Sequence, residues 1–412
     1  MPRIQDDFRR GQLAVAALFF SLGFQYASWA SRIPAIKAHL GLSAAEVGLL
    51  LMATGVGAVA SFPLVAWLMR RLGSRRLSLL SALCLALLLL AMAELPDYPV
   101  ALLVMCVDGV LVGALNVSMN AQGAALEVRF KRNTMARLHA TFSGGSLVAA
   151  LLASAMNLLT SSVLPHFLVA AGLLLAALVG ARPGLLAEDA PAEAAGEPEK
   201  TEKEKKKRSW TLPARLTLWL GIAMAFGTIT EGAMNDWSSL YLKEVAKASA
   251  ELAPMGIAVV SVMMVLARLL TDGWRSRWGD GPIVRTGSAL AALGLALALL
   301  VGGVVPALIG FACVGLGVAA VTPCVYVAAA AQGSDALTLV ATMGTVGLLG
   351  GPPVIGFVAN AAGLVWGMGA VALAALIVSL CATRISWPAA PGRETPEPQL
   401  LARAEPAQAD AH

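Results

Sequence analysis

The sequence predicts an all-α membrane protein with twelve transmembrane helices in two pseudo-symmetric six-helix bundles. Hydrophobic residues make up 58% of the 412 residues, charged residues only 13%, and the mean hydropathy is +0.74. Soluble domains are about half apolar and about a quarter charged. The apolar residues form long runs, and the second half of the chain repeats the series of runs found in the first. Lipid is therefore the solvent for most of the protein.

Twelve runs are long enough to cross the hydrocarbon core, which takes about 20 apolar residues. Backbone groups in lipid must be satisfied within the segment, so runs without strand-like alternation become helices. In the first half the predicted helices are 12–35, 44–70, 76–95, 98–124, 135–159 and 163–181. In the second half they are 213–242, 252–274, 282–303, 306–331, 336–360 and 363–385.

The pattern of runs divides the chain into four parts. Residues 1–181 and 213–386 are the predicted bundles, 182–212 a charged linker, and 387–412 a tail that is expected to be disordered. The linker contains EPEKTEKEKKKR and is too poor in apolar residues to fold by itself. We expect a monomer.

Landmarks of the first half recur in order in the second. The spacing is 208 residues for two matched pairs and 206 for two more, after a two-residue deletion. The matched landmarks are Trp29 with Trp237, Gly48 with Gly256, Arg71-Leu72-Gly73 with Arg277-Trp278-Gly279, and Gly144-Gly145 with Gly350-Gly351. The two halves are therefore expected to be related structural repeats.

Lysine and arginine positions predict the orientation of the chain. All of them except Arg32, Lys37, Lys243 and Lys247 fall on the side of the N-terminus and the linker. The positive-inside rule then places both termini and the linker in the cytoplasm. The net charge of +5 follows from this topology, and no nucleic-acid-binding module is recognisable.

Several other classes of site are not predicted. The five cysteines lie inside apolar runs without paired spacing, and the four histidines lie in different segments, so neither a disulfide framework nor a metal site is expected. There is no Walker loop and no nucleophile elbow. We expect neither an enzyme nor a cofactor.

The loop between the second and third predicted helices carries a family resemblance. AWLMRRLGSRR (Ala66–Arg76) resembles the G-x-L-x-D-R-x-G-R-R signature of the major facilitator superfamily, with Arg71 and Gly73 in register. Ala66 and Arg70 depart from its glycine and aspartate. The equivalent loop of the second half supplies Asp272 and Arg277. The resemblance implies a conformational role for Arg71, Gly73, Asp272 and Arg277, with membrane anchoring as the simpler alternative for Arg75 and Arg76.

Four further strings resemble a bacterial permease branch near the fucose and proton symporters. They are WASRIP, NVSMNAQGAALE, RLHATFSGG and EGAMNDWSSLYL. In fucose-type permeases an acid four residues before an asparagine takes part in proton coupling. The corresponding pair here is Asn116 and Asn120, and an asparagine does not titrate, so that role does not carry over to Asn116.

Asp108 and Glu231 are the predicted proton-coupling residues. Each lies inside an apolar run, where an unpaired charge costs several kcal/mol and is usually paired, neutralised or functional. Asp108 precedes Asn116 and Asn120 by eight and twelve residues, so all three are expected near one face toward a central cavity. Structural hydrogen bonding to a neighbouring helix is the alternative for Asp108.

A polar cavity at the bilayer midplane is expected between the bundles, as the family resemblance implies. Trp29, one turn from Gln25, would offer an aromatic surface, with a place in the interfacial belt as its alternative. The predicted substrate-binding residues are Gln25, Trp29, Asn116, Asn120, Glu231, Asn235 and Tyr326.

The remaining predictions concern gating. Asp236 is expected to pair with Arg32 between the outer ends of the first and seventh helices, either as a gate or as a simple surface pair. Arg268 is expected to pair with Asp272 one turn away. Gly351 and Pro352 should bend the eleventh helix.

Together these features and the resemblance predict a proton-coupled secondary transporter of a small polar solute, sugar-like or another metabolite, in a bacterial inner membrane. Alternating access by rocking of the two bundles is the expected mechanism. Sodium is an alternative coupling ion. Efflux of a drug or metabolite by antiport is an alternative function. A receptor or non-transporting partner protein on a transporter fold is an alternative of another class.

Overall fold

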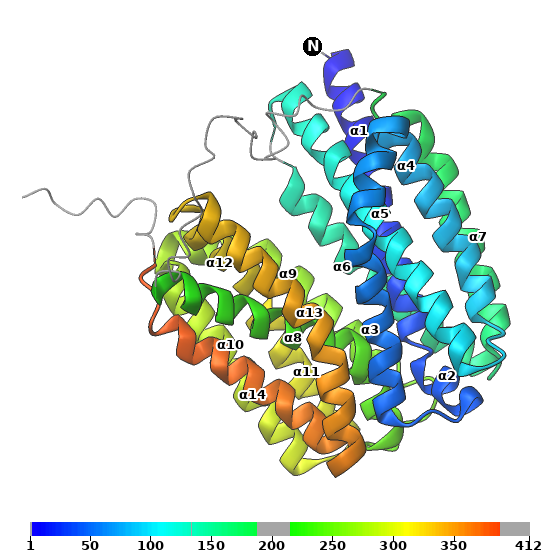
Figure 1. Ribbon diagram of the computed structural model, residues 1–412, viewed down its shortest axis with the longest axis vertical. Coiled ribbons are helices and arrows are strands. Elements are labelled where there is room, and N and C mark those ends of the chain that lie inside the picture. Colours follow the sequence, from blue (N-terminus) through cyan, green and yellow to red (C-terminus); the bar gives the residue numbers. More distant parts are fainter. Residues whose placement is uncertain (1, 133, 188–214, 388–412) are drawn as a thin grey trace, which may run out of the picture.

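The computed structural model describes residues 2–132, 134–187 and 215–387 (Figure 1). The regular elements of these residues are all helices, as the apolar runs predict. The first half contains α1 (Pro2–Ala30), α2 (Ile33–Leu40), α3 (Ala44–Ala60), α4 (Phe62–Met92), α5 (Tyr98–Phe130), α6 (Met135–Leu159), α7 (Val163–Ala181) and the 3-10 turn η1 (Arg182–Gly184). The second half contains α8 (Arg215–Glu244), α9 (Met255–Trp278), α10 (Asp280–Val301), α11 (Val304–Val318), α12 (Val321–Ala330), α13 (Ser334–Ala362) and α14 (Leu364–Ala382).

Ten helical segments of the described residues are long and apolar enough to cross a membrane, with α11 and α12 counted together as Val304–Ala330. The number is eleven if α2 and α3, bent by 119°, form one broken span. The prediction of twelve differs mainly at α9, where the apolar part, Met255–Thr271, is shorter than a full span. The boundary predicted between residues 70 and 76 lies where expected, because α4 is two helices joined at the non-helical Gly73. The second predicted span is itself divided between α3 and the first part of α4, with a break after Ala60. The chain is a multi-pass helical membrane protein.

The helices form two groups, which we call the first bundle (α1–α7) and the second bundle (α8–α14) (Figure 1). Equivalent helices pack closely in each, α1 on α6 and α8 on α13. A Cβ atom on Gly145 would lie 2.2 Å from the carbonyl oxygen of Phe20, and one on Gly347 would lie 2.3 Å from that of Ala225. Glycine is therefore required at both crossings, because any side chain would push the helices apart.

The repeated Arg-x-Gly landmark has the same backbone conformation in both halves. Gly73 has φ 71° and ψ 165°, and Gly279 has φ 81° and ψ 166°, a region that only glycine occupies readily. The guanidinium of Arg71 lies 5.7 Å from the ring of Trp67, and that of Arg277 lies 5.6 Å from Trp278. The two loops are thus matched in backbone conformation at the glycine, and the conformational role of these residues stays a prediction.

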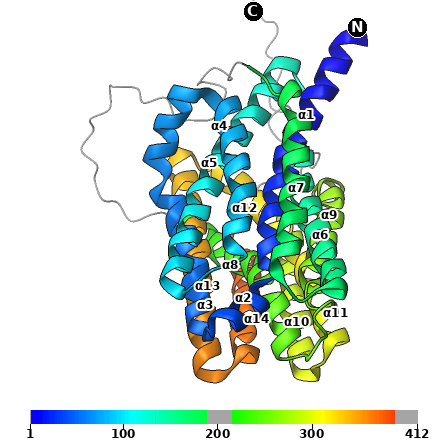
Figure 2. The same cartoon turned by 90° about the vertical axis from the view of Figure 1, so that its right-hand side faces the viewer.

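We call the end where α7 finishes and α8 begins the linker end, and the opposite end, where α2 lies, the far end (Figure 2). The bundles contact each other chiefly through α3 with α13 and α6 with α9. At the first contact a Cβ on Gly48 would lie 2.7 Å from the carbonyl oxygen of Pro352. α13 continues as a helix through Pro352 and Pro353, and the bend predicted at Gly351 and Pro352 stays a prediction. Gly351 is buried against Ile229 of α8.

The first residues of the predicted linker pack onto the first bundle. The side-chain amide of Gln122 donates to the carbonyl oxygen of Leu186 and accepts from its backbone N–H at 3.0 and 2.9 Å. Leu185 and Leu186 are buried. The rest of the predicted linker, from residue 188 onward, and the predicted tail after Trp387 lie outside the described residues.

Candidate functional site

Asp108 is a buried carboxylic acid in the middle of α5. It is 0% exposed, and its Oδ1 accepts a 2.8 Å hydrogen bond from Nε2 of Gln25 on α1, which is 1% exposed. Asp108 Oδ2 and the amide oxygen of Gln25 have no hydrogen-bond partner among the described residues. An ionised carboxylate with one neutral donor is costly to bury, whereas a protonated carboxyl is neutral and is itself a donor. The described contacts therefore include one neutral donor and no cation for Asp108.

Asp108 does not share the environment of the two asparagines with which it was grouped. Asn116 is exposed and Asn120 is half-buried, and Nδ2 of Asn120 donates to the backbone and side-chain oxygens of Asn116 at 2.7 and 3.1 Å. Eight residues along an α-helix leave a residual rotation of about 80°. That rotation turns Asp108 toward α1, so the expectation of one continuous polar stripe facing a cavity is wrong for Asp108.

Glu231 and Arg268 form an ion pair that also reaches the first bundle. Arg268 Nη2 on α9 lies 3.0 Å from Glu231 Oε1 on α8, and Nη1 donates to Oγ of Ser143 on α6 at 2.7 Å. The side chains of Glu231 and Arg268 are 29% and 24% exposed. The side chain of Asp272 is not among those described, so its expected pairing with Arg268 stays a prediction. Sequence spacing favoured the neighbour one turn away, whereas the packing of three helices brought Glu231 to this arginine.

Asn235 and Tyr326, both predicted to line the cavity, remain accessible. Asn235 is half-buried one turn beyond Glu231, and its Nδ2 lies 3.4 Å from the backbone oxygen of Glu231. Tyr326 lies on α12, and its side chain is exposed. Their expected role in substrate binding stays a prediction.

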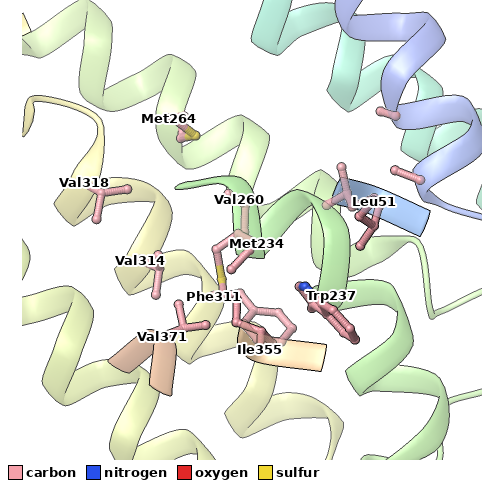
Figure 3. Packing of buried hydrophobic residues seen from close by; sticks show 14 of the residues in the cluster. Leu51, Met234, Trp237, Val260, Met264, Phe311, Val314, Val318, Ile355 and Val371 are labelled. Carbon is pink, nitrogen blue, oxygen red and sulfur yellow. The ribbon is translucent and has the colours of Figure 1, made fainter. Parts of the chain in front are cut away.

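Trp29 is a core residue in this conformation. It is 2% exposed, its ring packs edge-on against Tyr26 at 5.1 Å, and its indole N–H has no described partner. Its counterpart in the repeat, Trp237, is also fully buried and lies with Phe311 and Ile355 in the core (Figure 3). Both alternatives from the sequence, a stacking surface and an interfacial belt position, required an exposed ring. They do not describe Trp29 in this structure.

Asp236 pairs with Tyr26 rather than with Arg32. The buried Asp236 of α8 accepts a hydrogen bond from the hydroxyl of Tyr26 on α1, which links the two bundles. Arg32 instead points into the first bundle, where Nε lies 3.1 Å from Nδ1 of His166 and Nη1 donates to Asn157. The predicted ion pair is wrong because α6 and α7 supply partners for the guanidinium on its own side of the interface.

The far end holds further polar contacts between the bundles. They are the ion pair of Lys37 with Glu244 at 2.5 Å, the bond from Asn157 Nδ2 to the carbonyl of Ala250 at 2.8 Å, and the bond from Ser154 Oγ to the carbonyl of Glu251 at 2.5 Å. Among the described residues, the other hydrogen bonds between the bundles are those of Tyr26 with Asp236 and of Arg268 with Ser143. The bundles are thus joined from mid-depth to the far end, and no described hydrogen bond joins them at the linker end.

Several of these residues were missed by sequence reasoning. Lys37 and Glu244 lie 207 residues apart, almost the repeat spacing, so the repeat itself offered a signal for their pairing. Tyr26 and Asp236 lie 210 residues apart and offered the same kind of signal. Ser143 and His166 gave none, because their partners are set by helix packing. No group of three or more metal-ligating side chains occurs among the described residues.

The comparisons with known proteins agree with this architecture. The family model of the Major Facilitator Superfamily matches residues 13–335. An uncharacterised MFS-type transporter of Yersinia pestis is 32% identical over 91% of this chain and 96% of its own length. The membrane protein MosC of Rhizobium meliloti is 31% identical over 85% of this chain and 84% of its own length.

Solved structures match in fold at low identity. The nucleoside transporter NupG aligns with a TM-score of 0.66 and 15% identity, covering 91% of this chain and 98% of its own. FucP in the outward conformation aligns with a TM-score of 0.62 and 16% identity, covering 93% of this chain and 100% of its own.

Proposed function

The chain belongs to the major facilitator superfamily of secondary transporters, and from this premise we propose that it moves a small polar solute across a bacterial inner membrane in symport with protons. The observation that carries the proposal is the set of polar and ionisable side chains at mid-depth, where α1, α5, α6, α8 and α9 approach one another. Ionisable groups at that depth are costly unless they have a function or a partner.

We assign the coupled proton to Asp108. Its single neutral partner, Gln25, and its lack of exposure favour the protonated form when the far end is closed. Alternating access requires that the two protonation states differ in their preference for the two access states, since only such a difference shifts a conformational equilibrium.

The distribution of polar contacts supports an inward-open state for the described conformation. The bundles are joined at the far end by Lys37 with Glu244 and by Asn157 and Ser154 with the loop before α9. With both termini and the linker in the cytoplasm, as the basic residues predict, the far end is the extracytoplasmic one.

Two experiments test this proposal. Reconstituted protein should accumulate a substrate when a proton gradient is imposed and lose that accumulation with a protonophore, whereas persistence with protonophore and dependence on sodium would reject proton coupling. For the orientation, alkaline phosphatase fused after residue 205 should be inactive. An active fusion there would overturn the topology.

A further inference from the structure

The Glu231–Arg268 ion pair is the one described ion pair at mid-depth, and three features make it suited to a ligand. Both side chains keep about a quarter of their surface exposed, although each lies well inside its helix. The pair lies at the contact between α9 of the second bundle and α6 of the first, where Ser143 takes one arm of the guanidinium. The Nε of Arg268 makes no described hydrogen bond, so donor capacity remains.

Charge balance restricts what such a pair can accept. The pair is neutral as a unit, and an added anion or cation would leave one uncompensated charge in a medium of low dielectric constant. A solute that carries one positive and one negative group can insert between Glu231 and Arg268 and keep the total charge unchanged. Its carboxylate would bond to the arginine fork, which matches carboxylate geometry, and its ammonium group would bond to the glutamate.

Neighbouring side chains supply hydrogen bonds for the same solute. The hydroxyl oxygen of Ser143 already accepts a hydrogen bond from Arg268, and its hydroxyl hydrogen is available to a carboxylate. Asn235 lies one turn from Glu231 on α8 and is half-buried, with its amide oxygen in no described hydrogen bond. Neutral donors and acceptors beside a paired acid and base are typical of sites for small polar zwitterions rather than for multiply charged anions.

We therefore propose that the substrate is a small zwitterion with an amine and a carboxylate, which inserts into the Glu231–Arg268 ion pair. The inference rests on the proposed transport function and specifies its substrate class. It assigns Arg268 and Glu231 to substrate recognition and leaves the coupled proton to Asp108.

The test is a binding screen on the purified full-length protein, with the standard amino acids as probes and the melting temperature as the readout, since a ligand of the folded state raises it. Each amino acid that binds is compared with its decarboxylated amine and with its deaminated hydroxy acid. Each analogue should bind at least about tenfold more weakly, because it leaves one charge of the opened pair uncompensated.

Variants test whether the selectivity for zwitterions depends on the Glu231–Arg268 pair. Arg268→Gln and Glu231→Gln should each remove binding of the zwitterion, while Arg275→Gln, which breaks the pair with Asp280 at the linker end, should leave it unchanged. Should the single variants fail to fold, the exchanged double variant Glu231→Arg with Arg268→Glu keeps a pair and should bind the zwitterion again.

The outcomes separate this inference from the proposed function. Binding and proton-driven uptake of neutral sugars, with no response to any zwitterion, would overturn the substrate class and leave the transporter intact. Zwitterion binding that survives in both glutamine variants would overturn the assignment of the pair. Zwitterion binding that needs the pair, but without any proton-driven uptake, would support the inference and reject proton symport.

Discussion

The two bundles treat their mid-depth acids in opposite ways. In the first bundle Asp108 is fully buried, and its one described partner is the neutral amide of Gln25. In the second bundle Glu231 is partly exposed and is neutralised by Arg268. A carboxylate in the first environment has one neutral donor to offset its charge, whereas one in the second has a cation beside it. The repeated fold thus places one acid beside a neutral amide and the other beside a cation.

The largest expected effect comes from removing the proton at the first site. Asp108→Asn keeps the shape of the side chain and an oxygen for Gln25, but it cannot titrate. Gradient-driven accumulation should fall at least about tenfold, to the level of equilibration, because the protonation states no longer bias the access states. Counterflow exchange should persist. Accumulation at the normal level would show that Asp108 does not carry the proton, and Asp236→Asn provides the matched comparison of a second buried acid.

At the second site, the Glu231–Arg268 pair, we expect the loss of one charge to lower the stability of the protein. Arg268→Gln leaves Glu231 without its cation, and we expect a loss of about 1–3 kcal/mol in stability, below the range for a fully buried pair because both side chains are partly exposed. The double variant with Glu231→Gln should recover part of that loss. Thermal melting of the single and double variants measures the difference, and equal melting temperatures would contradict a coupled pair.

The two repeated loops have the same backbone conformation at their glycine. Matched substitutions test whether they also contribute equally to stability. Gly73→Ala and Gly279→Ala each force a Cβ into a conformation that glycine alone tolerates, at a cost of about 1–3 kcal/mol. We expect similar losses of melting temperature in the two variants. Gly172→Ala, at a helical position where a Cβ meets nothing within 4 Å, is the control and should have little effect.

The smallest expected effect concerns the contact that joins the bundles. Tyr26→Phe removes the hydroxyl that donates to Asp236, and a lost hydrogen bond of about 1 kcal/mol shifts the access equilibrium about fivefold away from the far-end-closed state. Cysteines at positions 120 and 235 in a cysteine-free background report this shift through their reaction with a water-soluble thiol reagent. Unchanged labelling rates would assign Tyr26 to packing alone.

The sequence by itself determined the class of the protein, its all-helical spans and its internal repeat. Long apolar runs leave only helices as an option in lipid, and the matched Gly73 and Gly279 adopt the same backbone because both lie in equivalent reversals. It also identified Asp108 and Glu231, since an acid inside an apolar run is conspicuous wherever its side chain points.

Tertiary structure alone decided the partners of these groups. Asp108 contacts Gln25 rather than a cavity, Asp236 contacts Tyr26 rather than Arg32, and Arg268 contacts Glu231 on another helix. Helical periodicity fixes which residues of one helix share a face, but it leaves open which neighbour that face meets. That choice depends on how helices distant in sequence pack, which in this chain is set by close crossings such as that of Gly145 with Phe20.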